Sequence, residues 1–224
     1  MRSIVAFGLW HLLVSIVSAE TPEAMANLLV SQGADGEIAG WKSYHPEPAA
    51  KTGEVWQLQS AGVLVCKGQP LGYLLTEKDY TNFVLKLQWR WPPGGKAGNG
   101  GVLVRMTGPH RVWPKSLEAQ LNAGQAGDFW GLAGYQLSGP AERMQLLEHP
   151  KFGKLTNLKK TAELEKPIGE WNDYEIAVDG GQVTLKVNGQ VVNQTTDCEV
   201  VPGKILLTAE GDEYHFRKVQ LQVK

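Results

Sequence analysis

The sequence predicts an all-β domain, either a sandwich or a barrel. Short segments in which apolar and polar residues alternate are separated by turns rich in Gly, Pro, Asn and Asp. One such turn, residues 179–182 with the sequence DGGQ, separates two β-branched segments at hairpin spacing. Helical patterns are few and short, so strands are expected to supply almost all of the core.

The first 19 residues have the composition of an export signal. Arg2 supplies the positive start, residues 4–17 the apolar run, and Val17-Ser18-Ala19 the small residues of a cleavage site. The run of about 14 residues is shorter than the roughly 20 that span a bilayer. We therefore expect a mature chain beginning at Glu20, without a membrane anchor and periplasmic or secreted; the alternative is an uncleaved anchor.

Residues 20–224 are enough for one domain with a sizeable core. The full chain carries 22 Lys and Arg against 23 Asp and Glu, and the basic residues are scattered. This balance disfavours nucleic acid and anionic membrane as partners. The oligomeric state stays open.

The cysteines and histidines indicate no metal-binding motif. Cys66 and Cys198 could form a disulfide in an exported protein or remain two buried thiols. The histidines after the signal lack ligand-like spacing. No cofactor is required by the sequence, although Glu118, Glu210 and backbone carbonyls could hold a hard divalent cation.

The expected elements follow the chain in order. Thr21-Pro22-Glu23 could cap a short helix through Leu29. Residues 83–91 alternate as a strand whose odd-numbered positions face the core. The charged, proline-containing stretch 138–169 is expected to be a functional loop with a helical turn near residues 141–147. Further strands are expected at 174–178, 183–187, 204–209 and 214–223.

Two alternating strands direct polar side chains toward one surface. In residues 101–105, Val102 and Val104 face the core and Arg105 the opposite side. In residues 116–122, three apolar residues share one side, and the other side carries Glu118, Gln120 and Asn122. An arginine, a glutamate and two amides suit a neutral polyhydroxylated ligand. The alternative is a surface salt bridge between Arg105 and Glu118.

The tryptophans divide by their position in the strand pattern. Trp41, Trp56 and Trp89 are expected to pack in the core. Three others stand at loop or strand edges beside the polar residues, where an aromatic ring could stack on a sugar: Trp113, Trp130 and Trp171. Packing at the rim is the alternative for each.

Several short motifs occur in a consistent order along residues 36–224. They are GW at 40–41, NGGVLVR at 99–105, WPKSLEAQ at 113–120, GDFWG at 127–131, GEWN at 169–172, VNG at 187–189, AEG at 209–211 and FRKV at 216–219. Together they resemble the 3-keto-disaccharide hydrolase domain family, also described as 3-keto-glucoside lyase and 3-keto-2-hydroxyglucal hydratase. The sequence departs from the family pattern at two positions. The family often has Ser where this sequence has Gly100, and Asp where this sequence has Asn122.

The resemblance implies a concanavalin-like (jelly-roll) sandwich of two antiparallel sheets whose concave sheet holds carbohydrate. It also implies a glycoside substrate oxidised at carbon 3. Such a ketone acidifies the proton on carbon 2, so a base can remove it and the aglycone can leave carbon 1; water then adds back to the glucal. This chemistry needs a base, a stabiliser of the enolate and an acid.

The expected roles follow from these requirements. Glu118 is the candidate base, Arg105 the candidate enolate stabiliser, Gln120 and Arg90 candidate hydroxyl-binding residues, and Glu210 a second carboxylate. His110 and His149 are loop candidates for the acid, although a solvated or structural role is the favoured alternative for each.

The leading hypothesis is thus an exported enzyme that cleaves 3-keto-glycosides by elimination and hydration. A non-catalytic lectin-like module using the same face is the first alternative. A laminarinase-type hydrolase is the second, but it needs two carboxylates close together on one strand. The alternate positions after Glu118 hold only the amides Gln120 and Asn122.

Overall fold

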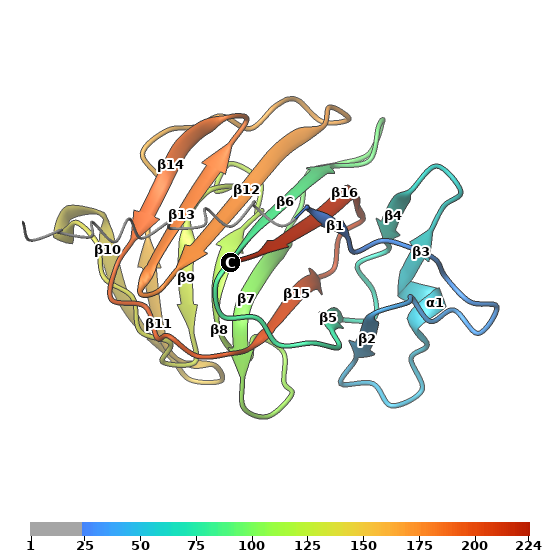
Figure 1. The fold of residues 1–224 in the computed structure, drawn as a ribbon, viewed down its shortest axis with the longest axis horizontal. Coiled ribbons are helices and arrows are strands. Elements are labelled where there is room, and N and C mark those ends of the chain that lie inside the picture. Colours follow the sequence, from blue (N-terminus) through green and yellow to red (C-terminus); the bar gives the residue numbers. More distant parts are fainter. Residues whose placement is uncertain (1–23) are drawn as a thin grey trace, which may run out of the picture.

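The computed structural model describes residues 24–224 and shows two antiparallel sheets packed face to face (Figure 1). This confirms the predicted all-β class and the jelly-roll sandwich. The predicted export signal, residues 1–19, lies outside the described residues. Within residues 24–224, no helix is long and apolar enough to cross a membrane.

The first sheet contains eight strands. In order across the sheet they are β14 (Gln190–Thr195), β13 (Gln182–Val187), β12 (Asn172–Asp179), β6 (Phe83–Arg90), β16 (Tyr214–Val223), β4 (Val63–Cys66) and β3 (Trp56–Leu58), with β1 (Ala26–Asn27) also paired to β16. The predicted hairpin is formed by β12 and β13, whose register places Asp179 opposite Gln182.

The second sheet also contains eight strands. Their order is β10 (Met144–His149), β11 (Gly153–Leu158), β9 (Phe129–Leu132), β8 (Lys115–Gln120), β7 (Gly101–Thr107), β15 (Lys204–Ala209), β5 (Gly72–Thr76) and β2 (Trp41–Tyr44). Helical structure in the described part is limited to α1 (Thr52–Val55) and the 3₁₀ turn η1 (Ala141–Arg143).

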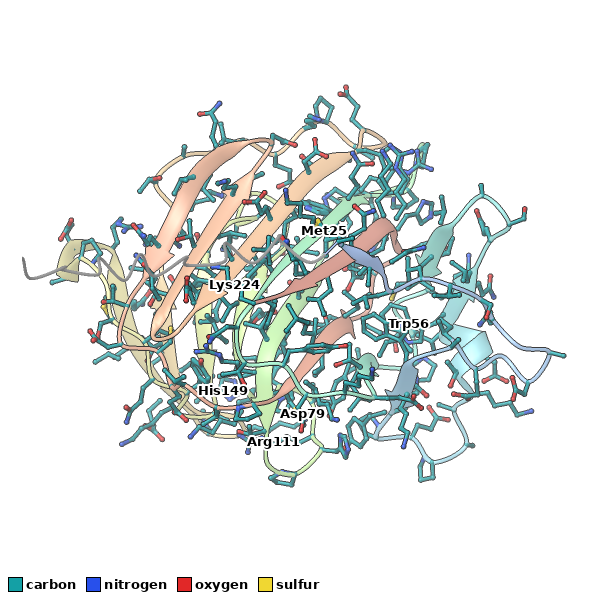
Figure 2. All side chains as sticks on the ribbon, viewed as in Figure 1. Met25, Trp56, Asp79, Arg111, His149 and Lys224 are labelled. Carbon is teal, nitrogen blue, oxygen red and sulfur yellow. The ribbon has the colours of Figure 1, made fainter. Side chains whose placement is uncertain are left out.

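The main core lies between the sheets. Alternate residues of β6 face it, as the sequence predicted for residues 83–91. Trp41, Trp56 and Trp89 belong to this core, which confirms their predicted packing role (Figure 2 labels Trp56).

A second apolar cluster covers the outer face of the second sheet, the face turned away from the first sheet. It is formed by Tyr73, Leu75, Leu103, Met106, Leu132, Leu155 and Leu206, with Tyr44, Trp113, Trp130 and Phe152 packed against it. If this face were open to solvent, its strand residues would be exposed, but they are buried. The side chains packed on them therefore cover this face, and we call these four the cover: Tyr44, Trp113, Trp130 and Phe152.

Two predicted local structures are wrong. Where a helix through Leu29 was expected, Ala26–Asn27 is instead a short strand paired with β16, which gives its backbone groups partners that a short isolated helix would lack. The expected cap, residues 21–23, lies outside the described part. The stretch 138–169 contains the predicted helical turn as η1, but the expected loop is then replaced by the hairpin β10–β11.

Both cysteines are buried free thiols, which is the second of the two alternatives that the sequence left open; they form no disulfide. The Cys66 thiol on β4 faces the carbonyl of Thr208 at 3.7 Å. Cys198 instead contacts the hydroxyl of Thr195 at 3.8 Å, and its backbone N–H donates to Gly181 in the β12–β13 turn. Burial raises the pKa of both thiols, which keeps them protonated and unreactive.

Arg105 does not face the side that strand alternation predicts. The register of β7 and β8 shifts between Val104 and Thr107, and Arg105 itself has a φ of 53°. Such a bulge adds a residue to one strand and redirects its side chain. The guanidinium is consequently turned toward the first sheet, and neither the predicted catalytic role nor the alternative salt bridge with Glu118 is supported.

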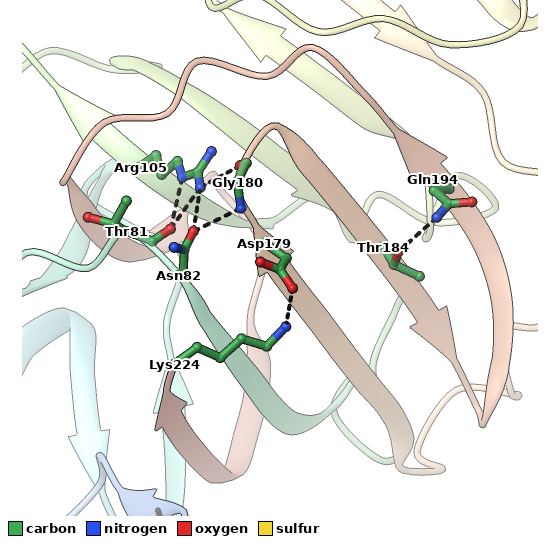
Figure 3. Close-up of polar contacts among 8 residues, drawn as sticks. All are labelled: Thr81, Asn82, Arg105, Asp179, Gly180, Thr184, Gln194 and Lys224. Carbon is green, nitrogen blue, oxygen red and sulfur yellow. Dashed lines mark hydrogen bonds and ion pairs between the residues drawn. The ribbon is translucent and has the colours of Figure 1, made fainter. Parts of the chain in front are cut away.

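The Arg105 guanidinium ties the two sheets together at one end of the sandwich (Figure 3). It donates to the carbonyls of Thr81 at 2.8 and 3.1 Å, Gly180 at 2.8 Å and Glu199 at 2.8 Å, and to Asn82 Oδ1 at 3.3 Å. The side chain is fully buried and, among residues 24–224, no carboxylate forms an ion pair with it. Backbone carbonyls therefore satisfy this charge.

We predict that Arg105→Ala destabilises the fold by about 3–5 kcal/mol, because the buried carbonyls of Thr81 and Gly180 lose their donor and that of Glu199 keeps only the Tyr135 hydroxyl. Urea unfolding measures this loss, with Lys224→Ala as the control because its ion pair with Asp179 is exposed. A loss of less than 1 kcal/mol for Arg105→Ala would contradict the structural role.

Candidate functional site

The candidate site lies on the outer face of the second sheet, at the middle of β8. Glu118 is directly opposite Leu103 on β7 and Trp130 on β9, and both neighbours belong to the outer-face cluster. The side chain of Glu118 therefore points to the face predicted from strand alternation. It is only 4% exposed, because the cover encloses it.

Gly101 leaves the space that the Glu118 carboxyl occupies. It lies opposite Gln120 on the neighbouring strand, and a Cβ at this position would stand 2.1 Å from Glu118 Oε1. Any larger residue would displace the carboxyl. The adjacent Gly100 faces the core, where a Cβ would stand 2.6 Å from the Tyr214 ring, which explains why Ser is not accommodated here.

Glu210 provides a second carboxyl at the end of β15. Its Oε2 accepts a hydrogen bond of 2.5 Å from Asn99 Nδ2, and the backbone N–H of Asn99 donates to Asp212 Oδ2 at 3.2 Å. Only β7 separates β15 from β8 in the sheet, so Glu210 and Glu118 approach the same region. The sequence prediction of Glu210 as a second carboxylate remains a prediction that this placement supports.

The two carboxyls interact strongly. Burial raises the pKa of Glu118 well above its usual range, and the charge of Glu210 raises it further. Burial also raises the pKa of Glu210, but the neighbouring Thr208 and Trp113 side chains lower it. Asn99 donates to Glu210, whereas no donor to Glu118 exists among the described residues. Of the two carboxyls, Glu210 is therefore the one whose ionised form its surroundings favour.

Unpaired polar atoms concentrate at this place. Among residues 24–224, seven buried side-chain polar atoms lack a hydrogen-bond partner, and four belong to Glu118, Glu210, Asn99 and Trp130. Buried polar groups are normally satisfied, and leaving one unpaired costs about 1–3 kcal/mol. Such a concentration indicates a site that a polar ligand completes.

The loop between β7 and β8 closes over this site. Trp113 packs on Phe152 with ring centroids 4.2 Å apart, so the loop meets the β10–β11 hairpin. His110 contacts Tyr73 Oη at 2.8 Å through Nδ1 and stacks on Tyr44. Trp113 is thus part of the cover, and His110 packs beside it. His110 contacts two tyrosines rather than the carboxyls.

Two other predicted residues lie on β8 or directly after it. Gln120 shares the outer face with Glu118, and its Oε1 accepts the backbone N–H groups of Leu121 and Asn122. Its amide nitrogen remains available to a ligand. Asn122 instead stabilises the following turn by donating to Gln125 Oε1 at 3.1 Å, so the structure does not support its predicted role in substrate binding.

Arg90 and Trp171 are not part of this site, which corrects their predicted roles. Arg90 alternates with core residues of β6 and therefore faces outward from the first sheet, across the sandwich from Glu118. Trp171 lies against the guanidiniums of Arg90 at 4.4 Å and Arg217 at 4.1 Å. The parity of β6 was predicted correctly, but sequence alone could not assign its outer face to a sheet.

His149 and the possible metal ligands complete the predicted set. The Nδ1 of His149 accepts the backbone N–H groups of Lys151 and Phe152, which makes it a turn-forming residue at the tip of β10–β11 (Figure 2).

Within the described chain, no group of three or more His, Cys, Asp or Glu could hold a metal ion. Glu118 and Glu210 would need carbonyl or external ligands to do so.

Sequence reasoning missed Asn99, Gly101 and Tyr73. Asn99 and Gly101 stood within the NGGVLVR motif, but a single sequence shows neither the hydrogen bond to Glu210 nor the space left for Glu118. Tyr73 lies on a strand with no distinctive pattern. Its position directly opposite Thr208 depends on long-range pairing of β5 with β15.

Comparisons with known proteins bear on the family and the fold of this chain. A family model described as a 3-keto-alpha-glucoside-1,2-lyase-like domain matches residues 31–222. No curated protein sequence matches the chain significantly. A solved structure described as a "putative glycosyl hydrolase" from Parabacteroides distasonis ATCC 8503 has 21% identity and a TM-score of 0.58, covering 90% of this chain and 100% of that chain.

More distant structures share the fold. The carbohydrate-binding module CBM66 from Bacillus subtilis has 10% identity and a TM-score of 0.56, covering 82% of this chain and 95% of its own. The β-glucanase of Bacillus licheniformis has 9% identity and a TM-score of 0.56, covering 90% and 99%. These likenesses establish the concanavalin-like sandwich.

We predict that Glu118→Gln stabilises the protein increasingly as pH rises. A carboxyl whose pKa is raised by folding binds protons more tightly in the native state, so stability falls as pH increases from the ordinary glutamate pKa to the raised one. The amide does not titrate, so its melting temperature should exceed that of the wild type at pH 8 and approach it near pH 4. Each kcal/mol corresponds to about 2–4 °C in a chain of this size. A difference that does not vary with pH would contradict the raised pKa.

Proposed function

Because the chain belongs to the 3-keto-alpha-glucoside-1,2-lyase-like family, we propose that it is an exported enzyme that cleaves 3-keto-glycosides. The reaction is an elimination followed by hydration, which together amount to hydrolysis. The observation that carries this proposal is the buried pair Glu118 and Glu210, with unpaired oxygens that point to a missing ligand. The predicted signal of residues 1–19 supports export.

The pair suits a reaction that needs one base and one acid. Glu210, stabilised as a carboxylate by Asn99, takes the proton from carbon 2 of the keto sugar. The electrons of that C–H bond form the enolate and then expel the aglycone from carbon 1. Glu118 gives its proton to the departing oxygen. This assignment exchanges the roles expected from sequence, where Glu118 was the base.

Hydration uses the same two groups in reverse. Glu118, now a carboxylate, removes a proton from the water that attacks carbon 1 of the glucal. Glu210 returns its proton to carbon 2. Both residues recover their starting states, and the net change is addition of one water across the glycosidic bond.

The enolate oxygen requires a hydrogen-bond donor, since Arg105 is directed elsewhere. Trp130 lies directly opposite Glu118, and its buried indole Nε1 has no partner among the described residues. We assign it this role: a buried N–H directed at developing charge needs no rearrangement during the reaction. Gln120 provides a second N–H on the same face.

Turnover of p-nitrophenyl 3-keto-glucoside and of unoxidised p-nitrophenyl glucoside tests the function. We expect release of p-nitrophenol from the first substrate only, because the ketone is what acidifies carbon 2. Turnover of the parent would favour the laminarinase-type reaction, to which a carboxyl pair is also suited. Binding without turnover of either compound would favour a lectin-like module.

The two roles can be separated with 1,5-anhydro-3-keto-glucitol, which has no leaving group on carbon 1. We predict that Glu210→Gln reduces deuterium exchange at carbon 2 by about 10²-fold or more, because this variant lacks the base. Glu118→Gln should retain exchange at carbon 2, yet it should no longer cleave 3-keto-glycosides whose aglycone is a poor leaving group. Nuclear magnetic resonance in D₂O measures the exchange, and loss of exchange in Glu118→Gln alone would restore the assignment expected from sequence.

A further inference from the structure

Asn99 connects Glu210 to a polar atom that nothing in the described chain satisfies. Its Nδ2 donates to Glu210 Oε2 at 2.5 Å, and its Oδ1 is buried without a partner. One amide thus supports a carboxylate with its nitrogen and leaves a buried acceptor at its other end.

The orientation of this amide follows from its neighbour. An ionised carboxylate only accepts hydrogen bonds, so the nitrogen must face Glu210 and the oxygen must face away from it. The backbone is held as well. Asn99 N–H donates to Asp212 Oδ2, and a Cβ at Gly98 would stand 2.3 Å from Asp212 Cβ, so the two segments are tightly packed.

The unpaired atoms around Asn99 include acceptors and a donor. Asn99 Oδ1 and Glu210 Oε1 are acceptors without a donor, the indole of Trp130 is a donor without an acceptor, and Glu118 Oε1, also unpaired, belongs to a carboxyl that the proposed function protonates. A ligand that completes the site must therefore supply donors as well as an acceptor. Hydroxyl groups fit this requirement, since each donates one hydrogen bond and can also accept.

We propose that Asn99 determines substrate specificity by accepting a hydrogen bond from one hydroxyl of the sugar at Oδ1, while its Nδ2 positions Glu210. The inference rests on the proposed function, because it places the sugar beside Glu210. A site with a buried polar acceptor discriminates strongly against an analogue that lacks the matching hydroxyl, because the acceptor is then left unpaired.

The test compares p-nitrophenyl 3-keto-glucoside with its 2-, 4- and 6-deoxy analogues. For the wild type, we expect kcat/KM to fall about 10- to 100-fold for one analogue. For Asn99→Ala, the parent should be slower and that same analogue should lose less than about 3-fold further. If Asn99→Ala slows all four substrates by one common factor, Asn99 has a structural role only and the proposal is overturned.

Two variants separate the functions of the amide. Asn99→Asp keeps an acceptor, so it should retain the discrimination while the acidic limb of the pH profile moves upward, because a like charge replaces the donor to Glu210. Asn122→Ala is the matched control, since this amide bonds only within its turn. Loss of discrimination in Asn99→Asp would contradict the acceptor role.

Failure of the proposed function would be recognised separately. If the wild type turns over no 3-keto-glycoside, calorimetric binding of methyl glucoside and its deoxy analogues makes the same comparison between wild type and Asn99→Ala. The proposal is supported if one deoxy analogue binds more weakly than methyl glucoside to the wild type but not to Asn99→Ala. Equal weakening in both proteins, or no binding of any of these sugars, overturns it.

Discussion

The burial of two carboxyl groups on one face of the second sheet is the constraint on which the site depends. Burial raises the pKa of both Glu118 and Glu210, and the charge of Glu210 raises the pKa of Glu118 further. The hydrogen bond from Asn99 favours the ionised form of Glu210. In the proposed mechanism this difference lets Glu118 act as the acid and Glu210 as the base.

Other features of the fold serve this arrangement from a distance. Gly101 leaves space for the Glu118 carboxyl, and the Trp113–Phe152 contact closes the face above it. The β7 bulge directs Arg105 inward, where it holds the loops at the end of the first sheet. The same strand thus contributes to the site at its beginning and to stability at its end, which follows the general division between a rigid scaffold and the groups it presents.

The fold was largely predictable because strand alternation is a local signal. The parity of Glu118 and Gln120 and the packing of the core tryptophans follow directly from it. Arg105 was misplaced because a bulge reverses parity without a clear sequence mark. Arg90 and Trp171 were misplaced because the assignment of a strand to a sheet depends on long-range pairing. Asn99 acts through one hydrogen bond to a residue 111 positions away, a distance that local patterns cannot reveal.

The most direct test of the account is the ionisation state of the two carboxyls. Carbon-13 labelling of glutamate side chains allows their protonation to be followed by nuclear magnetic resonance from pH 4 to pH 9. The account predicts one protonated carboxyl at pH 7 whose signal is absent from Glu118→Gln, while the Glu210 signal is that of a carboxylate. Two carboxylates at pH 7, or a protonated signal that disappears only in Glu210→Gln, would contradict it.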